Sequence, residues 1–184
     1  MEVPSLLENK RWPLSKTFLM ILKNLDKSFL IKLSLIFTIF LFDRISKIYV
    51  IYLDNKLFGS EIYSSNFLNI NLIWNEGIAF GLFSFNEKIF YNILTIIILI
   101  IILIIFFMTI KSNGLKKYSL LMILGGALGN VFDRLYYKAV PDFIDFHIGN
   151  FHWFIFNVSD IFITIGVILM IILETTNKHE TKYE

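Results

Sequence analysis

The stretch from Gly125 to Asp160 reads GGALGNVFDRLYYKAVPDFIDFHIGNFHWFIFNVSD and sets a polar block, with four aspartates, inside an otherwise apolar chain. Ionisable groups are costly to bury in a membrane, so they are rare there and usually line a site. Two carboxyl groups held close together share a proton, because both cannot easily ionise. The block therefore predicts carboxylate chemistry at a membrane boundary, with Asp142 and Asp160 as the candidate pair.

The rest of the chain has the composition of a membrane protein. Its 184 residues are 56% hydrophobic, and the mean hydropathy is +0.67. A soluble domain of this size does not need so much apolar surface. The chain has no cysteine, which excludes disulfides, thiolate metal ligands and a cysteine nucleophile.

Apolar runs near the length that crosses a bilayer as a helix predict four transmembrane helices. We place them at Leu33–Leu53, Ile89–Ile110, Tyr118–Tyr136 and Phe156–Leu173. In the segment Asn66–Phe83, apolar and polar residues partly alternate, and turn residues stand at Asn75-Glu76-Gly77. This pattern predicts a short β element followed by a turn. The predicted fold class is an all-α polytopic membrane protein with four transmembrane helices and a small extracytoplasmic β element.

The distribution of Lys and Arg predicts the orientation. Eleven of these residues fall before the first predicted helix, between the second and third, or after the fourth, whereas the two remaining loops hold three. Both termini are therefore expected in the cytoplasm. The polar loops Asp54–Lys88 and Tyr137–Ile155 are then expected outside it, with Asp142 on the second loop, flexible enough to meet Asp160. We expect a basic cytoplasmic extension over residues 1–32, a membrane domain over 33–174 and a cytoplasmic tail over 175–184.

The polar side chains of the predicted helices converge at the outer side of the membrane. At 1.5 Å per residue, Asp43 lies about 15 Å and Lys47 about 21 Å from the cytoplasmic end of the first helix. Helical spacing also puts the polar groups of each helix on one face. The three stripes are Asp43 and Lys47; Gly126, Asn130 and Arg134; and Asn157, Asp160 and Thr164.

Each polar residue also has a simpler interpretation. Asp43 and Lys47 can neutralise each other within one helix, and Arg134 can extend to the headgroups. Asp133 is then a local partner for Arg134, and Asp145 a solvated loop charge. His147 and His152 are interpreted as interfacial side chains, because no third ligand follows at a recognisable spacing.

Two function classes fit a polar cavity in a membrane. In a hydrolase, one carboxylate activates a water and a carboxylic acid polarises the carbonyl or protonates the leaving amine. In a transporter or proton relay, polar groups gather near the bilayer midplane. The outer clustering favours the hydrolase, and the sequence lacks the zinc-protease motif H-E-x-x-H and the serine motif G-x-S-x-G. No metal, cofactor or nucleic-acid partner is predicted.

Five motifs carry a family resemblance. In chain order they are DRISK, NEGIAFGLF, GGALGNVFDR, VPDFIDF and FNVSD. With these motifs, residues 29–174 resemble the lipoprotein signal peptidases (signal peptidase II), four-span aspartyl proteases of bacterial cytoplasmic membranes. Pro141 and Ser159 depart from the residues that are usual in this family, but neither departure removes a carboxylate.

The resemblance implies that Asp142 and Asp160 are the catalytic pair, with the site facing the outer side of the cytoplasmic (inner) membrane. The substrate would be a diacylglyceryl-modified prolipoprotein, cleaved before its lipidated cysteine to release the signal peptide. Membrane lipid and a globomycin-type inhibitor are the other implied partners. The implied substrate-binding or supporting residues are Asp43, Lys47, Asn75, Gly126, Asn130, Arg134 and Asn157.

Overall fold

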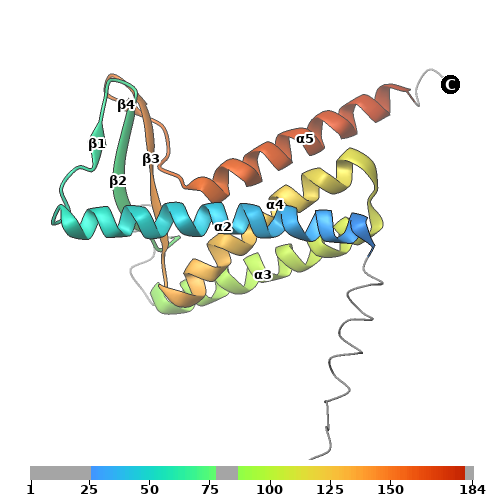
Figure 1. Ribbon diagram of the computed structural model, residues 1–184, viewed down its shortest axis with the longest axis horizontal. Coiled ribbons are helices and arrows are strands. Elements are labelled where there is room, and N and C mark those ends of the chain that lie inside the picture. The colour runs from blue at the N-terminus through green and yellow to red at the C-terminus, as the bar shows by residue number, and fades with distance from the viewer. Residues whose placement is uncertain (1–25, 78–86, 181–184) are drawn as a thin grey trace, which may run out of the picture.

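The computed structural model describes residues 26–77 and 87–180. Most of the predicted basic extension, the end of the NEGIAFGLF segment and residues 181–184 lie outside the described residues. Within them the chain forms four helices and a four-stranded antiparallel sheet (Figure 1). The helices are α2 (Lys27–Lys56), α3 (Glu87–Lys111), α4 (Gly114–Tyr136) and α5 (Val158–Glu180).

Two helices extend beyond the stretches predicted from hydropathy. Helix α2 begins at Lys27, before the expected Leu33, where the Asp26 carboxylate accepts a hydrogen bond from the Ser28 amide at 3.2 Å. At the other end of the chain, α5 continues to Glu180, past the expected Leu173. Hydropathy detects only the apolar part of a helix, whereas backbone hydrogen bonds continue until the helix is capped.

Helix α4 is the centre of the bundle, because it packs against α2, α3 and α5 (Figure 1). Glycines allow this close packing. A Cβ atom on Gly126 would lie 2.5 Å from the carbonyl oxygen of Ser159 on α5, and one on Gly129 would lie 2.5 Å from the Asp43 carboxylate on α2. Glycine at these two positions therefore lets α2 and α5 approach α4 closely.

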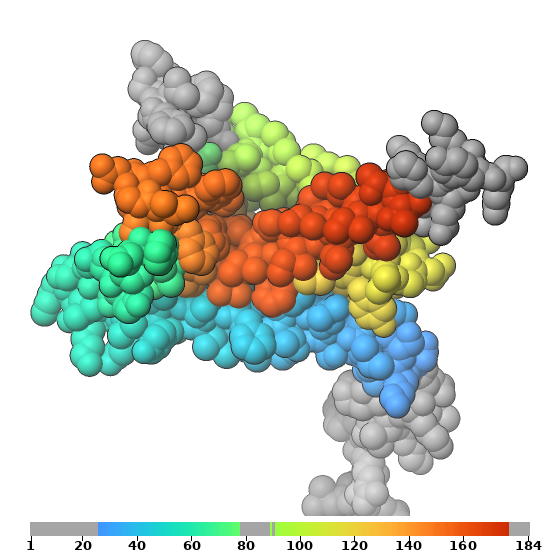
Figure 2. Space-filling model, turned by 90° about the horizontal axis from the view of Figure 1, so that it is seen from above, coloured from blue at the N-terminus to red at the C-terminus, as the bar shows by residue number. Residues whose placement is uncertain are grey.

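The sheet has the order β1 (Tyr63–Ser64), β2 (Leu68–Asn75), β3 (Val140–Ile148) and β4 (Phe151–His152). It lies at the end of the bundle where α2 ends and α5 begins, and in the view from above α5 runs beside α2 away from that end (Figures 1 and 2). The β element that we predicted before Asn75 is β2. The prediction of a polar loop after α4 is wrong, because residues 140–146 of β3 pair with β2 and the last two residues of β3 pair with β4.

The bundle exposes apolar side chains and buries charged ones. Phe37 and Phe42 on α2 are 62% and 61% exposed, whereas Asp43 and Lys47 are fully buried. Among the described residues, Tyr91–Lys111 of α3 and Val158–Thr176 of α5 are long and apolar enough to cross a membrane. The other two helices carry the charges that face inward, which lowers their hydropathy although their outer faces are apolar.

The buried charges form one network between α2 and α4. The Arg44 guanidinium donates to Asp43 at 2.8 Å and to both carboxylate oxygens of Asp133. The Lys47 ammonium lies 2.9 Å from Asp43 and 2.7 Å from Asp133. Two acids therefore balance two bases, as burial in a low dielectric requires.

This network corrects two interpretations of the sequence. Asp133 pairs with Arg44 and Lys47 on another helix, not with its neighbour Arg134. The Asp43–Lys47 pair is real, but it is half of a larger cluster and does not stand alone. We did not predict a role for Arg44. Two buried aspartates, one on each helix, need a second cation in addition to Lys47.

We expect Asp133→Ala to lower the free energy of unfolding by about 3–5 kcal/mol, because it leaves Arg44 and Lys47 buried with one carboxylate. Thermal or denaturant unfolding of the purified chain would measure this loss. As a control, Glu174→Ala removes the exposed pair with Lys116 (3.1 Å), and its effect should be below about 1 kcal/mol. Equal effects of the two substitutions would show that burial of the network does not contribute to stability.

Candidate active site

The two aspartates of the candidate pair come from the sheet and from the start of a helix. Asp142 lies on β3 opposite Ile73, next to a register shift in β2 between Ile70 and Ile73. Such bulges redirect side chains and are common beside active sites. Asp160 lies in the first turn of α5. The expectation that Asp142 sits on a flexible loop is therefore wrong, because it belongs to a paired strand.

Asn157 brings the two carboxylates together. Its side-chain amide donates to Asp142 at 2.6 Å, and its backbone amide donates to Asp160 at 3.1 Å. In return, its side-chain oxygen accepts from the Asp160 backbone amide at 3.3 Å. The last two bonds have the reciprocal pattern of a capping box, which starts a helix. The bonds that begin α5 therefore also position Asp160 relative to Asp142.

Asn75 holds Asp142 from the other side. Its side-chain amide donates to Asp142 at 2.8 Å, and its oxygen accepts from the Gly77 amide at 2.7 Å. Gly77 has a φ of +79°, a left-handed conformation that favours glycine. The turn after β2 therefore fixes the Asn75 side chain towards the carboxylate.

Burial controls the protonation of Asp142. Its side chain is nearly excluded from solvent, and this burial raises the pKa of the carboxyl above its ordinary value. The nearby Asp160 carboxylate also raises the pKa, whereas the donors Asn75 and Asn157 lower it. Asp142 therefore retains its proton to higher pH than an isolated aspartate does.

Asn130 connects the pair to the ion network. It donates to Asp160 at 2.8 Å and accepts from Lys47 at 2.8 Å. Asp43 also reaches this region, because its carboxylate accepts from the backbone amide of Ser159 at 3.1 Å. Asp43, Lys47, Asn75, Asn130 and Asn157 thus all connect to one or both aspartates.

Two predicted site residues are less closely connected. Gly126 provides space for α5 and contacts Ser159 by packing alone. Arg134 donates to the carbonyl of Asn130 at 3.4 Å, and its Nε atom has no hydrogen-bond partner among the described residues.

An apolar pocket of about 670 Å³ opens beside Asp160. Its walls come from the sheet and from α5, and most of them are aromatic or aliphatic. They include Phe146, Phe154, Phe156, Ile161 and Ile165. The site therefore has an ionisable pair at one end and an apolar cavity next to it.

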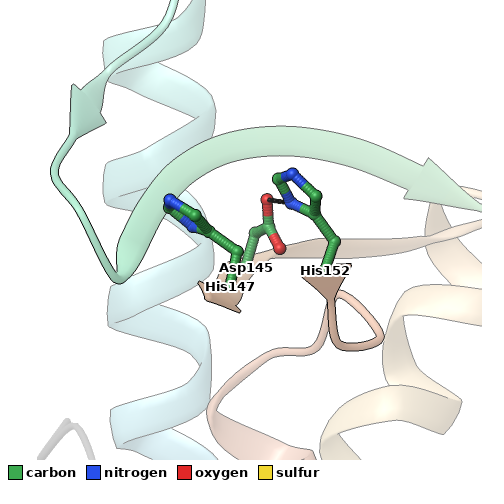
Figure 3. A group of neighbouring side chains, drawn as sticks. All are labelled: Asp145, His147 and His152. Atoms are coloured by element: carbon green, nitrogen blue, oxygen red, sulfur yellow. Dashed lines mark hydrogen bonds and ion pairs between the residues drawn. The ribbon is translucent and has the colours of Figure 1, made fainter. Parts of the chain in front are cut away.

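A second group of polar side chains lies further along β3. Asp145, His147 and His152 lie together on one side of the β3–β4 hairpin (Figure 3), and the two imidazole rings are stacked with their centroids 4.9 Å apart. Asp145 is 6% exposed, so its interpretation as a solvated loop charge is wrong. Asp145 is also the third residue that could join the two histidines in binding a metal. Local spacing did not reveal it, because the hairpin brings Asp145 and His147 to His152.

Comparisons with known proteins give the same family. The family model described as signal peptidase (SPase) II matches residues 35–176. The lipoprotein signal peptidase of Pelagibacter ubique (strain HTCC1062) is 50% identical over 148 residues, 80% of this chain and 89% of that protein. The lipoprotein signal peptidase of Anaplasma phagocytophilum (strain HZ) is 37% identical over 141 residues, 75% of this chain and 87% of that protein.

Solved structures agree with the fold. One, described as a bacterial membrane enzyme at 2.3 Å resolution, has a TM-score of 0.63 at 33% identity and covers 83% of this chain and 92% of its own. Another structure with that description, at 1.9 Å resolution, has a TM-score of 0.61 at 36% identity. The match covers 77% of this chain and 90% of the other. The region that the family model matches, residues 35–176, includes both aspartates, the sheet and most of the four helices. The chain belongs to the signal peptidase II family.

Proposed function

We propose that this chain is an aspartic endopeptidase that removes signal peptides from bacterial prolipoproteins, with Asp142 and Asp160 as its catalytic residues. Membership of the signal peptidase II family supports a peptidase acting on lipoprotein precursors. One observation supports the aspartic catalytic type: Asn157 donates hydrogen bonds to both carboxylates and so holds them close together.

The geometry supports a general acid–base mechanism. The pair enters the reaction with one proton between its two carboxyls. The ionised carboxyl takes a proton from a water, whose oxygen attacks the peptide carbonyl, while the protonated carboxyl donates to the developing oxyanion. Collapse of the tetrahedral intermediate breaks the C–N bond, and a proton passes to the leaving amine. Asn75, Asn130 and Asn157 hold the two carboxyls in place throughout.

The pocket beside Asp160 supports a lipidated substrate. Its aromatic and aliphatic walls match the acyl chains of a diacylglyceryl group better than they match a polar peptide. A substrate held there has its lipidated cysteine next to the carboxylates, so cleavage falls just before that residue. A globomycin-type inhibitor stays a prediction from the family resemblance.

We further propose that all four helices cross the bacterial inner membrane, with both termini in the cytoplasm and the aspartates towards the outer face. The exposed apolar surfaces of α2 and α4 support this, because their charges face inward. The excess of Lys and Arg at the opposite end of the bundle from the sheet supports the orientation.

Asp142→Asn and Asp160→Asn should each reduce cleavage of a diacylglyceryl-modified prolipoprotein by at least about 10²–10⁴-fold, the usual contribution of a general acid or base. The matched control is Glu61→Gln, an exposed carboxylate before β1, which should cleave at the wild-type rate. Mass spectrometry of the released signal peptide would measure the rate. Normal cleavage by either aspartate variant would exclude this pair as the catalytic residues.

Ile161→Ser should raise KM for the lipidated substrate by about tenfold, because one apolar wall of the pocket is lost. Ile168→Ser on the same helix lies outside the pocket lining and serves as the control. Wild-type enzyme should also process an unlipidated precursor poorly. Equal KM values for the two variants, or equal turnover of the two precursors, would contradict lipid recognition by this pocket.

The topology can be tested directly because the chain has no native cysteine. We expect Ser60→Cys, after α2, to react with a membrane-impermeant maleimide applied from the outside of spheroplasts. Ser112→Cys, between α3 and α4, should react only after lysis. The opposite labelling pattern would reverse the proposed orientation.

A further inference from the structure

The group of Asp145, His147 and His152 has no part in the proposed peptidase reaction. Asp145 and His147 are two positions apart on β3, and His147 is directly opposite His152 on β4. Residues two apart on a strand, and residues paired across strands, share a face of the sheet. The hairpin therefore presents two imidazoles and one carboxylate on one side (Figure 3).

The bonding of these groups is incomplete. Asp145 uses one carboxylate oxygen to contact His152 Nδ1 at 2.8 Å. Its other oxygen, and the Nδ1 atom of His147, are buried without a hydrogen-bond partner among the described residues. Buried polar atoms are rarely left unsatisfied in proteins, so such atoms call for a ligand. Here two of them belong to the same three-residue group.

We propose that Asp145, His147 and His152 form a binding site for a divalent transition-metal ion of the zinc class. Two imidazole nitrogens and a carboxylate oxygen are ligands that zinc accepts, with one coordination position left for water. The candidate ligand atoms lie within 4.8 Å of one another. Ligands of one zinc ion, at about 2.0–2.2 Å from it, are about 3.4 Å apart, a difference that side-chain rotation closes.

The position of the site indicates a structural role. The metal would cross-link β3 to β4 through three side chains. Asp142 is three residues earlier on β3, about 10 Å away along the strand, so the ion does not touch the reacting groups. His147 also lines the apolar pocket beside Asp160, so the two sites adjoin. The metal proposal uses neither catalytic aspartate, and its test measures metal binding, so either proposal can fail alone.

The test is metal binding to the full-length, tag-free chain in nanodiscs. Titration with Zn²⁺ by calorimetry should give one ion per chain, and Co²⁺ should give visible absorption bands of a low-symmetry site. Asp145→Ala, His147→Ala and His152→Ala should each weaken binding by more than about tenfold, since loss of even an outer-shell partner typically costs 10- to 100-fold. Zn²⁺ should also raise the Tm of the wild type but not that of His152→Ala.

Two control variants separate this site from other places where zinc could bind. Asp160→Asn changes the carboxylate pair, and His179→Ala removes the remaining histidine of the chain; both should bind Zn²⁺ as the wild type does. His152 is half exposed, so its substitution keeps the test valid if Asp145→Ala does not fold. Absence of stoichiometric binding, unchanged affinity in His152→Ala, or loss of binding in Asp160→Asn would overturn the proposal.

Discussion

The buried ion network between α2 and α4 is the interaction on which the rest of the structure depends. Asp43, Arg44, Lys47 and Asp133 are all excluded or nearly excluded from solvent. A buried charge is tolerated only where it is paired and hydrogen-bonded. Asp43 pairs with Arg44 and Lys47 on its own helix. Both of these bases also pair with Asp133 on α4, so the two helices are fixed in one register. The outer faces of both helices are then free to be apolar.

The same network reaches the candidate active site through two connections. Asp43 accepts from the Ser159 amide at the start of α5, and Lys47 donates to Asn130, which donates to Asp160. The carboxylate pair is therefore held by neutral amides, and one of them, Asn130, is itself bonded to Lys47 of the network. This arrangement places Asp160 without putting a cation directly on it.

Much of the site could be predicted from residue type and helical spacing. Asp43 with Lys47, and Asn157 with Asp160, lie on the same helix at three or four residues apart, and such pairs share a face whatever the rest of the fold does. Asp133 and Asp145 were misinterpreted because the fold, and not helical spacing, brings their partners to them. Asp133 bonds to Arg44 across two helices, and Asp145 bonds to His152 across a hairpin. Local spacing contains no information on such pairs.

The sequence by itself determined the membrane class, the helices and the family motifs, because hydropathy and helical periodicity are local properties of the chain. Tertiary structure alone decided how Asp142 is held. The residues around it, VPDFIDF, were interpreted as a loop, yet they form a strand because β2 supplies the backbone partners. A strand is stabilised by hydrogen bonds to another segment, so its existence depends on where that segment lies. The Gly125–Asp160 block therefore predicted the candidate pair of aspartates, and the pairing of β2 with β3 brought Asn75 to one of them.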